Sequence, residues 1–254
     1  MIVLELMITG WSSKYNQIIR EFGYKKQDDL KAALTLDSIL QRPFRISELK
    51  KMLYGKPVLV IGAGPSLKSS IPVIKKYKDT IKICADTALT HMIKNRIRPE
   101  IVVTDLDGDL ALLKKISKTS VVVVHAHGDN IQQLTVARNF RNCIGTTQTE
   151  KVGRVYNFGG FTDGDRCVFL ASHFGASKIF LFGMDFGTKI GKYSNTKESE
   201  RKIKLKKLKC GKMLLEWFAP KSKSELFILS SKIRGFKKIT YQELEHNIRS
   251  WNAF

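Results

Sequence analysis

The sequence predicts an α/β protein with a Rossmann-like, doubly wound and mostly parallel β-sheet, together with an N-terminal helical cap. Two observations support this fold class. Short apolar runs rich in β-branched residues recur between residues 58 and 183, and the intervals between them have room for crossover helices. Strands that are apolar throughout are typical of sheets buried on both faces. A chain of 254 residues that is 43% hydrophobic can fill the core of such a domain.

Two amphipathic segments come first and predict the helical cap, residues 1–54. In residues 12–24 and 28–40, apolar side chains recur every three or four positions, which is the spacing of one helix face. Pro43 follows the second segment and marks its end.

The predicted Rossmann-like core spans residues 55–190. Its expected strands are 58–62, 81–85, 101–105, 121–126 and 178–183. Each of these strands is followed by Gly, Asp or His. Because the carboxyl ends of parallel strands meet at one edge of a sheet, and ligands bind beyond that edge, we expect a functional site there.

Residues 191–254 form a basic C-terminal part, with a lysine-rich helix, a closing strand (224–231) and a terminal helix (237–248). Lysines crowd between Lys202 and Lys212. Such a run is usually a solvated helix face, but it can also neutralise a triphosphate or contact nucleic acid. The run lacks the interleaved aromatic residues of a base-stacking surface.

The charge balance indicates anionic partners. The chain has 44 Lys and Arg against 23 Asp and Glu, a formal net charge of +21. A charge of this size concentrates anions such as nucleic acid, acidic lipid or a polyphosphate substrate near the protein, although a generally basic surface is the simpler explanation.

Composition also excludes several classes. The four cysteines are scattered without CxxC or zinc-type spacing, so neither a disulfide framework nor a structural zinc site is expected. No apolar run approaches the length of a membrane span, and the first residues lack the features of a signal peptide. We therefore expect a cytoplasmic protein without membrane partners.

An acidic cluster follows the strand 101–105, in the segment VTDLDGDL. An extended backbone would point Asp105, Asp107 and Asp109 to one side, where a divalent cation would hold them together. Mg²⁺ prefers one or two carboxylates together with phosphate oxygens. A calcium-binding EF-hand is excluded by Leu110 and Ile116, and a solvated Asp-Gly turn is the structural alternative.

The segment GAGPSL follows the first strand and leads into an expected helix. Gly62 and Gly64 allow a tight turn, and Ser66 can cap a helix whose amino end attracts phosphate. Leu67 stands where a dinucleotide-binding motif has its third glycine, so NAD binding is disfavoured. An ordinary strand-to-helix turn is the alternative.

Two further segments contain candidate ligand-binding residues. HAHGDN places His125 and His127 at strand spacing beside Asp129 and Asn130, but no third His or Cys completes a zinc set. Phosphate or base contacts fit better, and ordinary polar residues are the alternative. FGGFTDGDR predicts a glycine-rich loop and a helix from about Arg166, in which acidic residues either cap the helix or contact a ligand.

These motifs, GAGPSL, TDLDGD, HAHGDN, GFTDGDRCVFLA and FGMDFG, resemble in this order the archaeal-type 6-hydroxymethyl-7,8-dihydropterin pyrophosphokinase family. The resemblance extends to the N-terminal helices and to the basic helix, and so covers nearly the whole chain. That family is similar in its nucleotide-binding core to thiamine pyrophosphokinases, and more distantly to bacterial glycosyltransferase-like proteins that modify flagellin.

The resemblance implies Mg²⁺-dependent transfer of a diphosphate from ATP to the pterin hydroxymethyl oxygen, with release of AMP, in folate- or methanopterin-type coenzyme synthesis. It implies Asp105 and Asp107 as catalytic metal ligands with Asp109 as a third, and Arg166 as a catalytic cation. The residues that it implies for ATP and pterin binding are Gly62, Gly64, Pro65, Ser66, Asp86, Thr87, His125, His127, Gly128, Asp129, Asn130, Gly159, Gly160, Thr162, Asp163, Asp165, Asp185, Lys202, Lys204 and Lys206.

Within that set, Asp86, Asp165 and Asp185 are the candidates for recognising the pterin's adjacent N–H donors, and a carboxylate, His125 or His127 is a candidate proton acceptor. The expected partners are therefore ATP and a reduced pterin, with a homodimer as a possibility.

Two other functions stay open from the sequence. A nucleotide-sugar glycosyltransferase would use the same acidic cluster on a metal-bound diphosphate and would form no AMP. A basic nucleic-acid-binding protein would use the charge alone, and its affinity would fall steeply with salt.

Overall fold

The computed structural model describes residues 8–191 and 198–252, and its described residues form one nine-stranded sheet in the order β6-β5-β4-β3-β2-β1-β7-β8-β9. Every strand pair in the sheet is parallel. The strands are β1 Pro57–Ile61, β2 Ile81–Ala85, β3 Ile101–Thr104, β4 Val121–His125, β5 Cys143–Thr146, β6 Val155–Tyr156, β7 Lys178–Phe182, β8 Glu225–Ile228 and β9 Lys237–Lys238. This order confirms the predicted doubly wound sheet.

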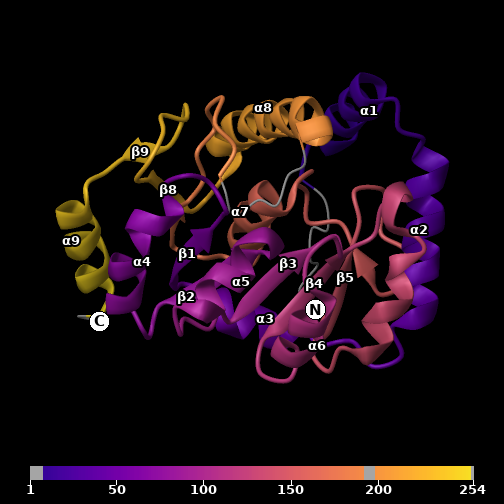
Figure 1. Ribbon diagram of the computed structural model, residues 1–254, viewed down its shortest axis with the longest axis horizontal. Helices are drawn as coiled ribbons and strands as arrows, with labels where there is room; N and C mark the ends of the chain where they lie inside the picture. The colour runs from indigo at the N-terminus through magenta and orange to yellow at the C-terminus, as the bar shows by residue number, and fades with distance from the viewer. Residues whose placement is uncertain (1–7, 192–197, 253–254) are drawn as a thin grey trace.

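Helices cover the sheet, with α8 across the top of the view in Figure 1 and with α2 and α9 at opposite ends. The helices are α1 Trp11–Phe22, α2 Lys26–Ile39, α3 Ile46–Leu53, α4 Leu67–Lys76, α5 Asp86–Lys94, α6 Leu110–Ile116, α7 Asp163–His173, α8 Arg201–Phe218 and α9 Tyr241–Asn252.

The alternation of side chains along each strand divides the core into two layers. In β1, Val58 and Val60 pack with residues of α1, α3, α7 and α8 on one face. Leu59 and Ile61 pack with residues of α2, α4, α5, α6 and α9 on the other face. Burial of each such side chain stabilises the fold by about 1.5–3 kcal/mol, which explains why the strands are apolar throughout.

The N-terminal helices share this core. Trp11, Tyr15 and Ile18 of α1 and Leu49 and Leu53 of α3 are buried in the same cluster as strand residues. The helices predicted for residues 1–54 are therefore confirmed where the structure describes them, and residues 1–7 lie outside the described part. The division of the chain into three segments stays a prediction.

The sequence predicted β1 to β4, β7 and β8, but it did not predict β5 or β6. Helix α7 begins at Asp163, earlier than the expected start near Arg166. The short strand β9 occupies the start of the segment expected to be helical, and α9 begins only at Tyr241.

The path of the chain creates a switch point beside β1. From β1 the chain adds β2 to β6 in one direction and then returns to place β7 on the other side of β1. At the carboxyl ends of β1 and β7, Gly62 N donates to Phe182 O and Gly64 N donates to Gly183 O. Ligands of such sheets bind at this kind of crevice.

All four cysteines are buried free thiols. Among the helices of residues 8–191 and 198–252, none has both the length and the apolar character needed to cross a bilayer.

The partly buried His173 predicts a pH-dependent stability. Its ring packs against Phe158 and Phe174, its Nε2 is buried and has no hydrogen-bond partner among the described residues, and burial lowers its pKa to about 4. Between its ordinary pKa of 6.5 and about 4, the unfolded chain binds a proton that the folded chain does not. Stability therefore falls as the pH falls through this window.

When the pH falls from 7.5 to 5, the unfolding free energy of the wild type should decrease. We expect the decrease in the His173→Phe variant to be about 1–2 kcal/mol smaller. Urea unfolding at the two pH values measures the difference. An equal loss in both proteins would show that His173 titrates normally in the folded state.

Candidate active site

A cavity of about 770 Å³ opens at the carboxyl edge of the sheet. Its walls come from the segments after each of the strands β1 to β7, from one face of α8 and from Tyr24 between α1 and α2. Its size lies within the range of small-molecule sites, and its position is the one predicted from the strand ends.

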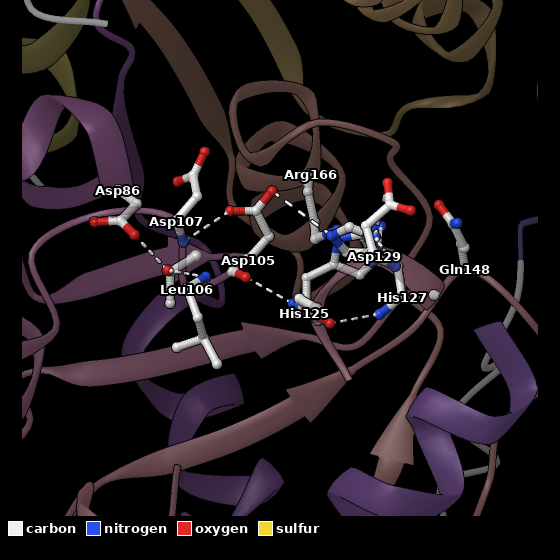
Figure 2. A network of polar contacts seen from close by, with 12 residues as sticks. Asp86, Asp105, Leu106, Asp107, His125, His127, Asp129, Gln148 and Arg166 are labelled. Carbon is white, nitrogen blue, oxygen red and sulfur yellow. Dashed lines mark hydrogen bonds and ion pairs between the residues drawn. The ribbon is translucent and has the colours of Figure 1, made fainter. Parts of the chain in front are cut away.

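Three carboxylates meet in this cavity. Asp105, Asp107 and Asp163 each offer an oxygen, and these oxygens lie within 4.8 Å of one another. Between the first two, Leu106 has a left-handed backbone (φ 70°), and its N–H donates to Thr104 Oγ1 at 2.8 Å. Figure 2 shows the resulting arrangement, with Asp105 and Asp107 side by side after β3.

Asp109 borders the cavity but does not join this cluster. Its side chain accepts from Leu112 N at 2.9 Å and caps α6. The prediction assumed an extended backbone, but the left-handed Leu106 ends the strand alternation. The third carboxylate is Asp163, at the start of α7, more than fifty residues further along the chain.

The carboxylates oppose one another's ionisation. The surrounding cavity walls and the charge of Asp105 raise the pKa of Asp107 to about 7. Burial and the charges of Asp105 and Asp107 raise the pKa of Asp163 well above its usual value. Burial also disfavours the charge on Asp105, but hydrogen bonds with His127 and Asp107 hold its pKa below the ordinary value. A cation between them relieves this repulsion, and three carboxylate oxygens are hard ligands that suit Mg²⁺.

The two histidines at the carboxyl end of β4 have different surroundings. His125 is buried, its Nε2 lies 2.9 Å from Arg166 Nη2, and burial with the Arg166 charge lowers its pKa well below 6.5. His127 accepts from Asp129 N at Nδ1, and its Nε2 lies 3.7 Å from Asp105 Oδ2. His127 thus faces the acidic cluster, whereas Nε2 of His125 is already paired.

The residues after His127 make hydrogen bonds that fix the loops around the acidic cluster. Asn130 donates to Asp105 O at 2.6 Å and to His125 O at 2.7 Å, which ties the β3 and β4 loops together. Gly128 N donates to Asp29 Oδ1 of α2 at 2.8 Å. Gly128, Asp129 and Asn130 do not border the main cavity.

Arg166 lies beneath the site rather than in it. It is completely buried, and its guanidinium remains charged at neutral pH because burial lowers its pKa only to about 10. The acceptors around the guanidinium are Thr146 Oγ1, Thr147 O, Gly159 O, Gly160 O and His125 Nε2. These hydrogen bonds hold the surrounding loops together, and the predicted phosphate contact stays a prediction.

The glycine-rich loop before α7 is held by a capping box. Asp165 is buried and accepts from Phe161 N and from both the N–H and the hydroxyl of Thr162. Thr162 borders the cavity, but Asp165 does not. Asp165 is therefore engaged within the loop and is not free to bind a pterin edge, contrary to the expectation. The carbonyl oxygens of Gly159 and Gly160 accept hydrogen bonds from Arg166, and neither glycine borders the cavity.

The turn after β1 is also internally satisfied. Gly62 and Gly64 border the cavity, whereas Pro65 and Ser66 do not. The sequence predicted that Ser66 caps α4, but its side chain makes no capping hydrogen bond. Its N–H and hydroxyl both donate to Asp185 Oδ2, at 2.9 and 2.8 Å. A carboxylate of the chain itself therefore occupies the anion position at this helix end.

Asp86 and Thr87 border the cavity, as predicted, from the start of α5. The Asp86 carboxylate accepts from Thr104 Oγ1, and burial raises its pKa to about 6, with a further contribution from Asp105. A Cβ on Gly108 would lie 2.4 Å from Asp86 Oδ1, so the loop after β3 must have glycine here to pack on this carboxylate.

The lysines of α8 divide between two faces. Lys204 borders the cavity, and so does Lys207, which the sequence reasoning missed. Lys202 is exposed and does not border the cavity, and Lys206 stacks over Phe22 with its Nζ 4.6 Å from the ring centroid. Positions 202 and 206 are four apart and can share one helix face, which does not include 204. Positions 204 and 207 are three apart and can share the face at the cavity, so this spacing would have indicated Lys207.

Other cavity residues were also missed. They include aromatic, apolar, amide and basic side chains: Tyr24, Gln148, Phe161, Met184, Phe186 and Lys189. The segment GMDFG was expected at this edge of the sheet, but its Met184 and Phe186 were not assigned to a ligand, and Gln148 follows a strand that was not predicted. Only the folded arrangement brings them to one cavity.

Comparison with known proteins adds family information. A family model described as "6-hydroxymethylpterin diphosphokinase MptE-like" matches residues 33–191. Three archaeal proteins named "6-hydroxymethyl-7,8-dihydropterin pyrophosphokinase" are similar to the chain. The Methanocaldococcus jannaschii protein is 42% identical over 234 residues, covering 85% of this chain and 97% of its own length. The Pyrococcus furiosus protein is 40% identical over 228 residues (87% and 97%), and the Methanothermobacter thermautotrophicus protein is 37% identical over 217 residues (82% and 93%).

Among solved structures, a MAf glycosyltransferase from Magnetospirillum magneticum AMB-1 is similar, with a TM-score of 0.54 and 15% identity. The alignment covers 88% of this chain and 41% of that one. At this identity the similarity shows a shared fold.

Proposed function

The chain belongs to the 6-hydroxymethylpterin diphosphokinase MptE-like family, and we propose that it transfers a diphosphate from ATP to the hydroxymethyl oxygen of 6-hydroxymethyl-7,8-dihydropterin. The observation that carries the proposal is the cluster of Asp105, Asp107 and Asp163 inside the large cavity. A diphosphokinase needs such a group of hard oxygen ligands to manage the charge of a triphosphate.

In the proposed reaction the hydroxymethyl oxygen attacks the β-phosphorus of ATP. The bond between that phosphorus and the oxygen bridging to the α-phosphorus breaks, AMP leaves with the bridging oxygen, and the hydroxyl proton is released. Bound Mg²⁺ would neutralise phosphate charge as a Lewis acid. Phosphoryl transfer depends mainly on positioning and electrostatic stabilisation, so the residues are assigned on that basis.

The three carboxylates are assigned to hold Mg²⁺. Lys204 and Lys207 are assigned to the phosphate oxygens, because both border the cavity and both carry charges that act on the acidic cluster. His127 is assigned to orient Asp105, which its Nε2 faces at 3.7 Å. His125 is an unsuitable proton acceptor, since its Nε2 is already paired with Arg166.

The direct test is incubation of the protein with ATP, Mg²⁺ and 6-hydroxymethyl-7,8-dihydropterin, followed by separation of the nucleotides. The proposal expects AMP and the pterin diphosphate in equal amounts. Release of ADP would contradict diphosphate transfer, and turnover of a nucleotide sugar without AMP would favour the glycosyltransferase alternative. The pathway branch and the cytoplasmic location stay predictions from the sequence.

Gly108 offers a test of the loop that carries the acidic cluster. We expect Gly108→Ala to lower kcat about 10-fold or more, because the added methyl displaces the Asp86 carboxylate that packs on this loop. Gly187→Ala is the matched control, since nothing lies within 4 Å of its added Cβ. Steady-state kinetics of both variants measure the effect; equal kcat values would show that the loop tolerates the displacement.

A further inference from the structure

Gln148 follows β5 and has an unused hydrogen-bond acceptor beside the cavity. The side chain is 2% exposed and borders the cavity. Its Nε2 donates to Asp29 Oδ2 at 2.7 Å, but its Oε1 is buried and accepts no hydrogen bond from the described residues. Leaving a buried acceptor unpaired costs about 1–3 kcal/mol, so a ligand that supplies a donor here recovers that free energy.

The direction of this amide is fixed by its neighbour. The carboxylate of Asp29 also accepts from Tyr15 OH at 2.6 Å and from Gly128 N at 2.8 Å. An ionised carboxylate only accepts hydrogen bonds, so the amide nitrogen of Gln148 must face Asp29. The carbonyl oxygen is therefore the atom of this amide that has no partner among the described residues.

The sheet order places Gln148 at one end of the cavity. Strand β5 lies two strands from β3, which carries the acidic cluster, and β1 with its glycine turn lies two strands away on the other side. At the usual strand spacing each end is about 10 Å from the cluster. In Figure 2, Gln148 and Asp86 lie at opposite ends of the row, with Asp105 and His125 between them.

Aromatic side chains enclose the same end. Tyr24 and Phe161 border the cavity, with their ring centroids 6.4 Å apart, and the charge of Asp29 acts on the Tyr24 hydroxyl. Rings of this kind pack against a flat heterocycle. This end of the cavity thus combines aromatic walls with a single fixed acceptor.

We propose, on the basis of the proposed function, that Gln148 is a specificity residue for the pterin and that its Oε1 accepts a hydrogen bond from the pterin's 2-amino group. Tyr24 and Phe161 contact the faces of the ring, and the hydroxymethyl group points toward the acidic cluster. The nucleotide then occupies the opposite, glycine-turn end. A site with a buried acceptor discriminates strongly against a substrate that lacks the matching donor.

The test compares pterin binding by the wild type and Gln148→Met, measured by isothermal titration of 6-hydroxymethyl-7,8-dihydropterin without ATP. We expect the variant to bind the pterin about 10-fold more weakly, with the KM for ATP changed less than twofold. The wild type should lose a similar factor with the analogue that has hydrogen in place of the 2-amino group, whereas the variant should bind both compounds alike.

Tyr15→Phe is the matched control, because Tyr15 donates to the same Asp29 oxygen as Gln148. It should lower thermal stability and leave pterin affinity unchanged, whereas a purely structural role for Gln148 would give both variants the same effect. A rise in the KM for ATP, with unchanged pterin affinity, would assign Oε1 to the nucleotide and overturn the proposal.

The analogue measurement needs only the wild type, so it can overturn the proposal even if Gln148→Met fails to fold. If the wild type forms AMP and pterin diphosphate but binds the two compounds equally, the inference about Gln148 fails while the proposed function stands. If the wild type neither binds nor converts the pterin, the proposed function fails.

Discussion

Replacing Asp163 with asparagine is expected to lower kcat/KM by about 10³-fold or more without unfolding the protein. Asp163 contributes one of three carboxylate oxygens that lie within 4.8 Å of one another. Loss of one charged ligand removes several kcal/mol of stabilisation from a metal-assisted transition state. Asp105→Asn should have an effect of similar size. Diphosphate transfer measured over a range of Mg²⁺ concentrations gives the comparison.

Asp109→Asn is the matched control, because asparagine caps a helix as well as aspartate does and Asp109 is engaged with Leu112 N. We expect its activity to stay within a few-fold of the wild type. Mg²⁺ should raise the melting temperature of the wild type and of Asp109→Asn but not of Asp163→Asn. If Asp109→Asn is the inactive variant and Asp163→Asn is active, the metal set predicted from the sequence is the correct one.

Replacing Arg166 with methionine is expected to destabilise the protein by about 3–5 kcal/mol. The substitution leaves three carbonyl oxygens and the His125 ring nitrogen without their donor in a fully buried position. Arg166→Lys should recover only part of this loss, because an ammonium has fewer donors and cannot reach acceptors on several loops. Urea unfolding of the purified variants measures the change.

Arg154→Met serves as the comparison for Arg166. Arg154 also makes several hydrogen bonds, to Asp37 and Gln41, but its side chain is 43% exposed, so we expect a loss of at most about 1 kcal/mol. If Arg166→Lys unfolds at the wild-type urea concentration and yet has a greatly reduced kcat, Arg166 contacts the substrate, as the sequence predicted.

The sequence could predict the main strands because each is a continuous apolar run, a pattern that only a sheet covered on both faces requires. It could not predict β5 and β6, since Cys143–Thr146 includes a glycine and Val155–Tyr156 is two residues long. These strands form because α2 packs over them: a Cβ on Gly145 would lie 2.8 Å from Leu40 and 3.1 Å from Leu36. That contact depends on residues about a hundred positions apart.

The site was predictable at the level of its position and its chemical character. Carboxyl ends of parallel strands must share one edge, so Asp86, Asp105 and His127 could be expected together. The cluster contains Asp163 and not Asp109 because the backbone of Leu106 is left-handed. A leucine does not favour that conformation, so the sequence did not indicate it. The sequence could not show that Arg166 and Asp165 are buried, because it does not tell a buried charge from an exposed one.

The two margins of the sheet have a consequence for self-association. The strands at these margins, β6 and β9, are each two residues long, and both residues of β9 are exposed lysines, Lys237 and Lys238. Short, charged outer strands discourage another polypeptide from adding to a sheet through its main chain. A second copy of this protein would therefore associate through helices or loops, and the outer strands of the sheet would not support aggregation.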